Sequence, residues 1–198
     1  GIGIPLGVTA AVHQNGWGDR ISMIIALLGV SIPTFWLAML MVLLFSLKLR
    51  WFPASGIGGW EYYVLPTVSL CFGGLATQAR QSRSSMLEVI RSDYVVTARA
   101  KGLSQREVIF KHALPNAMNP IITLAGNNLA VIFGGSVVIE NVFSFPGIGQ
   151  YMINAINQRD YPIVRGCVVM LAVVFAVIML LVDLCYAFND PRIKSRYV

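Results

Sequence analysis

The feature that most constrains the fold is a stretch without any charged residue, which runs from residue 22 to residue 47. A transmembrane helix needs about 20 mainly apolar residues to cross a hydrocarbon core of roughly 30 Å, so this stretch can cross with some tilt. Pro33 lies inside it and is expected to kink the helix. With further apolar stretches, the sequence predicts an all-α, polytopic integral membrane protein with spans at about 22–47, 63–82, 118–139 and 163–188.

Composition supports this class and argues against a nucleic-acid-binding protein. Hydrophobic residues make up 56% of the chain and charged residues only 12%, while the net charge is +6. The basic residues gather in particular loops, which indicates membrane topology rather than a basic patch on a soluble fold. The three cysteines lie in apolar stretches and are interpreted as packing residues rather than a disulfide or metal framework. Residues 1–11 look like the last turns of a span, so 1–198 is expected to be one transmembrane domain in the C-terminal part of a longer polypeptide.

The distribution of charge predicts the orientation of the chain. Most Lys and Arg residues fall on one side of the alternating spans, and only Lys48, Arg50, Arg159 and Arg165 fall on the other. Cytoplasmic loops carry the excess of positive charge in membrane proteins. The basic segment 92–116, between the second and third spans, is therefore predicted to face the cytoplasm.

The segment 92–116 predicts a compact helix–turn–helix. Residues 94–101 are rich in Ala, Arg and Lys, and Gly102 can supply the left-handed residue that ends a helix. Ser104 is followed three residues later by Glu107, the pattern of a capping box, so a second helix is expected to begin at once. Each arm would be about 15 Å long at 1.5 Å per residue.

The second helix of this segment carries two further local signals. Glu107 and Lys111 are four residues apart, in the favourable order for a helical ion pair. Pro115 is expected to interrupt the helix just before the next apolar stretch. The alternative is a solvated, positively charged loop without a further function. Such a loop would need neither the capping box nor these residue spacings.

Several strings in this order resemble the permease subunits of ATP-binding-cassette importers. The string T-A-R-A-K-G-L at 97–103, with H-A-L-P-N at 112–116, resembles the cytoplasmic loop of the dipeptide, oligopeptide and nickel branch. R-S-S-M-L-E-V at 83–89, E-N-V-F-S-F-P-G-I-G at 140–149 and R-D-Y-P at 159–162 agree with it. The resemblance covers nearly the whole chain and is to the first of the two permeases. The general importer pattern begins E-A-A, whereas this chain has V-T-A at 96–98, so the acidic contact made elsewhere in the superfamily is not expected.

The resemblance implies a type I importer membrane-domain fold in a bacterial plasma (inner) membrane. It implies a second homologous permease, two cytoplasmic ATPase subunits and an extracytoplasmic substrate-binding protein as partners, besides the lipid bilayer and without nucleic acid. No cofactor is expected in this chain, because ATP and Mg would be bound by the partner ATPases. The chain itself has no G-x-x-x-x-G-K phosphate-binding motif and is not expected to be an enzyme.

In the family, the cytoplasmic loop forms a coupling helix that docks on the ATPase. Small residues such as Ala98 and Ala100 would allow close approach there, while basic side chains offer hydrogen bonds and steering. The residues expected at this interface are Thr97, Ala98, Arg99, Ala100, Lys101, Gly102, Leu103, Arg106, Glu107, Leu114 and Pro115.

Two further sets of candidate residues lie outside this loop. Residues near an outer gate and the docked binding protein are Glu140, Phe143, Pro146, Gly147, Gly149, Arg159 and Asp160, with a purely structural turn as the alternative. Asn127 and Asn128 are candidates for the translocation pathway, although helix–helix hydrogen bonds are the favoured interpretation. Adjacent helical residues point about 100° apart, so the two amides are not expected to face one cavity.

Alternatives remain for the solute and for the class. A peptide is favoured over nickel or a metal chelate, and no metal site is predicted, because His13 and His112 are far apart without accompanying cysteines. A channel or ion-coupled transporter would need charged residues near the middle of its spans, and these spans have almost none.

Overall fold

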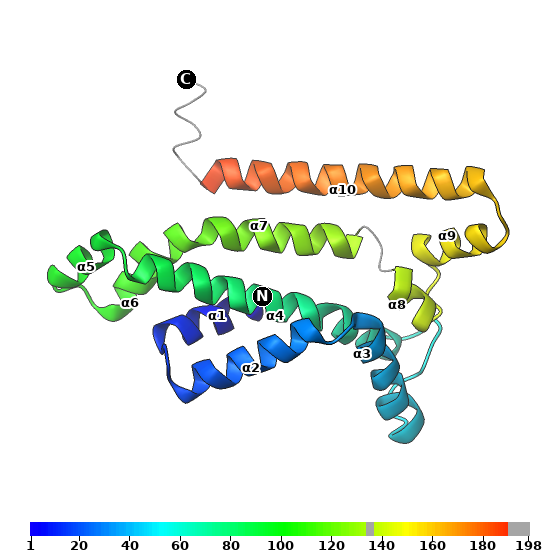
Figure 1. Ribbon diagram of the computed structural model, residues 1–198, viewed down its shortest axis with the longest axis horizontal. Helices are drawn as coiled ribbons and strands as arrows, with labels where there is room; N and C mark the ends of the chain where they lie inside the picture. Colours follow the sequence, from blue (N-terminus) through cyan, green and yellow to red (C-terminus); the bar gives the residue numbers. More distant parts are fainter. Residues whose placement is uncertain (134–136, 190–198) are drawn as a thin grey trace. The chain divides into compact units, whose positions relative to one another are not determined.

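The computed structural model describes residues 1–133 and 137–189, and the side chains of 1–132 and 137–184 (Figure 1). This part of the chain is helical, without β-strands. The elements are α1 (Gly3–Val12), α2 (Trp17–Ser31), α3 (Thr34–Met41), the π-helical η1 (Val42–Lys48), α4 (Glu61–Ile90), α5 (Asp93–Ala100), α6 (Gln105–Glu107), the π-helical η2 (Val108–Ala113), α7 (Leu114–Phe133), α8 (Val137–Val142), α9 (Ile148–Asn157) and α10 (Tyr161–Asn189).

The chain divides into two compact units, which are described separately. The first unit comprises residues 1–30, 75–127 and 181 onward, and the second comprises 31–74 and 128–180. The long helices α4, α7 and α10 each contribute residues to both units.

The first unit is built on one hydrophobic cluster that joins five elements. The cluster contains buried residues of α1, α4, α5, η2 and α7, namely Val8, Ala11, Met86, Val95, Ala98, Val108, Ile109, Ala113, Ala117 and Ile121. Gln78 of α4 is also buried and donates a hydrogen bond of 3.0 Å to the backbone carbonyl of Ile121 in α7. Burial of apolar surface is the main favourable term in such packing, so these five elements hold one another in place.

Helices α1 and α4 approach closely at Gly7. A Cβ atom at this position would overlap the backbone carbonyl oxygen of Ala79 and the Cβ of Ser82, and would lie 2.9 Å from the backbone nitrogen of Arg83. Glycine is therefore required for this contact.

The predicted kink at Pro33 is in fact a break. Helix α2 ends at Ser31 and α3 begins at Thr34, with Pro33 extended at φ −60° and ψ 134° just before α3. Proline removes a backbone donor and disfavours helical geometry in the residue before it. The first predicted span, 22–47, thus consists of two helices, the second of which continues into η1.

The predicted interruption at Pro115 is wrong. The chain is helical from Gln105 through η2 into α7, and Pro115 is the second residue of α7. In η2 the hydrogen bonds span five residues, as from the Leu114 N–H to the Ile109 carbonyl. This wider turn precedes the proline and accommodates a residue that lacks an N–H.

The second unit has its own core, around the turn that follows α8. Ala38, Leu65, Ile139 and Phe143 are buried together there. Helix α8 packs against α9 and against α3. Helix α9 lies between the third and fourth predicted spans and was not predicted, because a ten-residue amphipathic helix between two turns gives only a short periodic signal.

Helix α10 is the clearest apolar helix of the described chain. Its residues Tyr161–Leu184 have a mean hydropathy of 3.0 over the most apolar stretch, and only 6% of that stretch is buried within the chain. By length and composition it can cross a membrane, and the broken pair α2 and α3–η1 adds a second candidate if it is counted as one span. In the described regions the four predicted spans are helical apart from the break at residues 32–33, and their placement in a bilayer stays a prediction.

Candidate functional site

The segment 92–116 contains the predicted first helix and turn, whereas its second helix continues past residue 116 into α7. Helix α5 runs over Asp93–Ala100, and Gly102 follows with φ +79°. This left-handed conformation is open to glycine and costly for most other residues. The space around Gly102 is empty, since no atom lies within 4 Å of a Cβ placed there. The turn is thus fixed by its backbone and is sterically free on its outer side.

The second arm begins with the predicted cap. The Ser104 hydroxyl accepts a hydrogen bond of 3.3 Å from the Glu107 backbone N–H, and it donates one of 3.1 Å to the Glu107 carboxylate. Lys111 Nζ lies 3.2 Å from Glu107 Oε1, which confirms the predicted ion pair. Lys111 and then Ser104 lower the pKa of the Glu107 carboxyl, so Glu107 is ionised at neutral pH.

The eleven residues predicted at the ATPase interface differ in their exposure. Thr97, Arg99, Ala100, Lys101, Gly102, Leu103, Arg106 and Pro115 are exposed, and Glu107 and Leu114 are half-buried. Ala98 is only 6% exposed and belongs to the hydrophobic cluster, so its predicted role in close approach by another subunit is wrong. Val95 and Ala98 are three residues apart and share the inner face of α5. Leu114 also packs against this cluster.

Phe110 is a surface residue of this segment that the sequence analysis missed. It is 57% exposed and lines a shallow hollow of about 270 Å³ together with Arg106, Glu107 and Lys111. Aromatic and arginine side chains are enriched at protein interfaces, so the exposed Phe110 ring beside Arg106 is a candidate contact residue. The available signal was its spacing, since Arg106 and Phe110 are four residues apart on one helical face.

In the second unit, the segment 140–149 forms a turn between two helices. The Glu140 carboxylate oxygen Oε2 accepts a hydrogen bond of 2.9 Å from the Gln150 backbone N–H, which caps the N-terminus of α9. A Cβ at Gly147 would overlap this carboxylate, and a Cβ at Gly149 would lie 2.6 Å from the Val137 Cα. The Glu140 carboxylate thus caps α9, and the two glycines leave the space that this contact needs.

The other gate candidates also have structural contacts. Phe143 is buried in the core of the second unit, and its carbonyl accepts a hydrogen bond of 2.9 Å from the Gly56 N–H. Asp160 Oδ1 accepts a hydrogen bond of 3.2 Å from the Ile163 N–H at the start of α10. Arg159, just before it, has a positive φ of 59°. These contacts give Glu140, Phe143 and Asp160 structural roles, whereas no contact tests a gate.

The two candidate pathway residues have different surroundings. Asn127 is exposed and lines an open groove of about 420 Å³ with Gln81, Pro120, Thr123 and Leu124. Asn128 is half-buried, and its amide lies 4.0 Å from the Cβ position of Gly74. Asn128 does not line the groove of Asn127, as the 100° rotation between neighbours predicts. Gln81 and Thr123 were missed as polar neighbours of Asn127.

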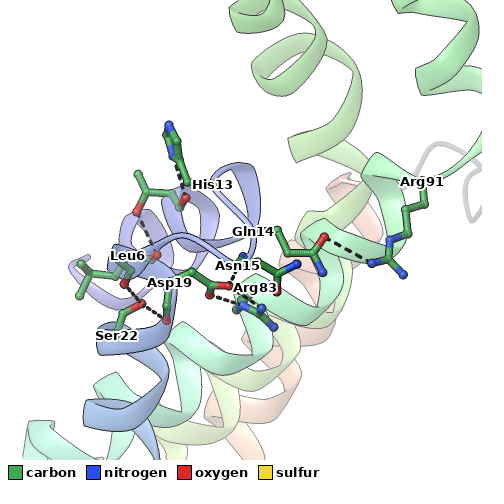
Figure 2. Close-up of polar contacts among 10 residues, drawn as sticks. Leu6, His13, Gln14, Asn15, Asp19, Ser22, Arg83 and Arg91 are labelled. Carbon is green, nitrogen blue, oxygen red and sulfur yellow. Dashed lines mark hydrogen bonds and ion pairs between the residues drawn. The ribbon is translucent and has the colours of Figure 1, made fainter.

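An ion pair ties α2 to α4 in the first unit (Figure 2). Arg83 Nε donates to Asp19 Oδ1 at 2.5 Å and Arg83 Nη2 donates to Asp19 Oδ2 at 2.7 Å. The Arg83 hydrogen bond is the main cause of the lowered pKa of the Asp19 carboxyl. Asp19 is only 3% exposed. Arg83 belongs to the R-S-S-M-L-E-V string of the sequence, but nothing in the sequence pairs it with Asp19, 64 residues away.

Comparison with known proteins identifies the family. Residues 3–195 match the family described as binding-protein-dependent transport system inner membrane component. The chain is 48% identical over 192 residues to the dipeptide transport system permease protein DppB of Bacillus subtilis, covering 97% of this chain and 62% of DppB. It is 41% identical over 194 residues to the glutathione transport system permease protein GsiC of Escherichia coli, covering 98% of this chain and 63% of GsiC.

The chain therefore belongs to the family of binding-protein-dependent transport system inner membrane components. The resemblance to importer permeases of the peptide branch is confirmed, and with it the all-α importer membrane-domain fold and the location in a bacterial inner membrane. The chain spans less than two thirds of the length of these relatives.

Proposed function

We propose that this chain is part of a permease subunit of an ATP-driven importer of peptides. The family match over residues 3–195 carries the proposal, and the functions that name two relatives, dipeptide and glutathione transport, favour a peptide as the solute. A channel or an ion-coupled secondary transporter is the less favoured class, since family members work in binding-protein-dependent transport.

The exposed part of the segment 92–116 docks on a cytoplasmic ATPase in this proposal. Its tip offers basic groups at Arg99, Lys101 and Arg106, the permissive turn at Gly102 and the aromatic ring of Phe110. The inner faces of both arms are anchored in the hydrophobic cluster of the first unit. A push on the tip is therefore passed to α1, α4 and α7 rather than absorbed within the segment, because packed cores have low compressibility.

The proposed partners follow from the same assignment. A second homologous permease would complete the translocation pathway, and two ATPase subunits would bind ATP and Mg, so that hydrolysis occurs outside this chain and no cofactor is bound here. An extracytoplasmic binding protein would deliver the solute. The exposed apolar surface of α10 supports contact with lipid or with a second membrane subunit, because water would disfavour it.

The gate and pathway assignments are proposals of narrower scope. Pro146, Gly147, Arg159 and their neighbours would lie near the outer gate, on turns that Glu140 and Asp160 hold in place through helix caps. Asn127 would line the pathway together with Gln81 and Thr123, which offer uncharged hydrogen-bonding groups suited to peptide amides. Asn128 is better supported as a packing residue beside Gly74.

Crosslinking tests the docking of the segment. Lys101→Cys, in a background where Cys71, Cys167 and Cys185 are Ser, is treated with a bismaleimide in membranes that contain the complete transporter. Because Lys101 is exposed, a crosslink to the ATPase that changes with ATP is expected. Ala98→Cys is the matched control: it lies one turn away on α5 but is buried, and should not crosslink. Absence of any crosslink from Lys101→Cys and Leu103→Cys in an intact complex would contradict the docking proposal.

A transport assay tests the solute. The purified complex in proteoliposomes, with its binding protein and ATP, is expected to accumulate a radiolabelled dipeptide. Uptake of ⁶³Ni²⁺ under the same conditions, without dipeptide uptake, would replace the peptide with the nickel alternative. Uptake of either solute without ATP would favour the channel or secondary transporter.

A further inference from the structure

We infer that Asp19 and Arg83 are positioning residues that link α2 mechanically to the ATPase-coupling segment. The inference rests on the proposed function and deepens it, because it names the contact that carries motion from the segment 92–116 toward the first predicted span. All the residues that carry it lie in the first unit.

The first link is the geometry of the pair. Both Asp19 oxygens face Arg83, through Nε at 2.5 Å and Nη2 at 2.7 Å. A bidentate arginine–carboxylate pair fixes orientation as well as distance, unlike the single contact that a lysine makes. The Asp19 side chain is 3% exposed and that of Arg83 is 23% exposed, so the pair is partly buried and is screened less than a fully exposed pair.

The second link is the rigid attachment of Asp19 to its own helix. Asp19 lies in the first turn of α2, and its Oδ2 also accepts a hydrogen bond of 3.0 Å from the Asn15 backbone N–H. Asn15 adopts a positive φ of 66° in the turn between α1 and α2. The same turn has a weaker second tie, a hydrogen bond of 3.3 Å from Arg91 to Gln14 (Figure 2). The turn is thus held at two places, through Asp19 by Arg83 of α4 and directly by Arg91, the residue that follows α4.

The third link runs from Arg83 to the coupling segment. Met86 follows Arg83 by three residues, one turn along α4, and is fully buried in the cluster with Val95, Ala98 and Val108. These contacts make the second half of α4 the common support of the coupling segment and of Arg83. A displacement of α5 and η2 is therefore transmitted through α4 to Asp19 and α2.

An alternative use of this pair is stability alone. Buried ion pairs often contribute little net stability, because the cost of desolvation offsets the attraction, while the loss of one partner leaves an uncompensated charge. A pair kept for stability alone would affect the amount of intact complex. A pair kept for positioning would affect how much solute is moved for each ATP hydrolysed.

The test measures peptide uptake and binding-protein-stimulated ATP hydrolysis on the same purified, reconstituted transporter. Three variants weaken the Asp19–Arg83 contact in different ways. Arg83→Lys keeps the positive charge but cannot make the two parallel hydrogen bonds of the guanidinium group. Asp19→Asn removes the negative charge, and the double variant Asp19→Asn with Arg83→Gln removes both charges. The ratio of uptake to hydrolysis is expected to fall about threefold or more in each. Asp19→Glu, which keeps the carboxylate, is expected to retain more of this ratio than Asp19→Asn.

The control is Arg80→Gln, which removes a positive charge from the exposed surface of α4, one turn before Arg83. Its ratio should equal that of the wild type. The inference is overturned if Arg83→Lys, the mildest change and the one most certain to assemble, shows the wild-type ratio. Failure of the wild-type complex to take up peptide or to hydrolyse ATP would instead overturn the proposed function.

Discussion

The Glu140 carboxylate accepts a 2.9 Å hydrogen bond from the backbone N–H of Gln150 at the start of α9. The two glycines of the P-G-I-G string lie against this contact, because a side chain at Gly147 would overlap the carboxylate. The segment 140–149, which contains predicted gate residues, thus also provides a helix cap. Its separate parts act together because the turn brings residue 140 back to residue 150.

The first prediction concerns this cap. Glu140→Ala should lower the stability of the complete transporter by about 0.5–2 kcal/mol, the usual cost of losing a helix cap. Glu140→Gln retains an acceptor oxygen and should cost less. Thermal unfolding of the detergent-purified complex, followed by intrinsic fluorescence, measures both. Equal midpoints for wild type, Glu140→Gln and Glu140→Ala would contradict the cap assignment.

The second prediction concerns the turn at Gly102. Gly102→Ala should destabilise the segment by about 1–2 kcal/mol, because alanine is disfavoured at a φ of +79° although no atom obstructs its Cβ. Gly102→Asn should cost less, since asparagine tolerates the left-handed region. Hydrogen exchange of the backbone amides of 103–108 reports the local change. Gly18→Ala, in the open first turn of α2, is the control and should not accelerate exchange there.

Much of this segment could be predicted from the sequence because its signals are local. The turn glycine, the Ser104 cap and the ion pair of Glu107 with Lys111 all act within four residues. Helical geometry alone brings such residues together. The second predicted span, 63–82, likewise lies within one continuous helix, α4, which extends to Ile90.

The remainder depends on contacts between distant residues. Asp19 and Arg83 lie on different helices and 64 residues apart, and nothing in either local sequence marks the pairing. Ala98 was assigned to the surface, because the sequence did not show that α5 lies on η2. The error at Pro115 has a different cause: a π-helical turn accommodates the proline, and such turns have no clear sequence pattern.

The third prediction concerns the contact of α1 with α4. Gly7→Ala should destabilise the complex by about 1–3 kcal/mol, because the added methyl group meets backbone atoms that cannot rotate away. The displacement should also weaken the pair of Asp19 with Arg83 in the same contact region. Thermal unfolding and the uptake-to-hydrolysis ratio are measured together. An unchanged midpoint would show that α1 is not held this closely to α4.

The fourth prediction concerns pH. Hydrogen bonding to Arg83 lowers the pKa of Asp19 below its ordinary value of 3.8. The pair therefore contributes fully to stability above the unfolded-state pKa, and this contribution is lost only as the pH falls through the lower folded-state value. The difference in unfolding midpoint between wild type and Asp19→Asn should stay constant from about pH 5 to pH 8. A difference that shrinks between pH 7 and pH 5 would mean that the carboxyl titrates there and is not held ionised by Arg83.

The last prediction concerns Phe110. Its ring is 57% exposed beside Arg106 and Lys111, outside the buried cluster. Phe110→Ala should therefore leave the stability of the permease within about 0.5 kcal/mol of the wild type, as for an ordinary surface change. If the ring is an anchor for the ATPase, the variant should release that subunit at a lower detergent or salt concentration, with a loss of about 2 kcal/mol or more in binding. Trp17→Ala, an exposed aromatic on α2 of the same unit, is the matched control and should not affect ATPase retention. Co-purification of the ATPase with each variant measures this, and equal retention by both would place the docking contact elsewhere on the segment.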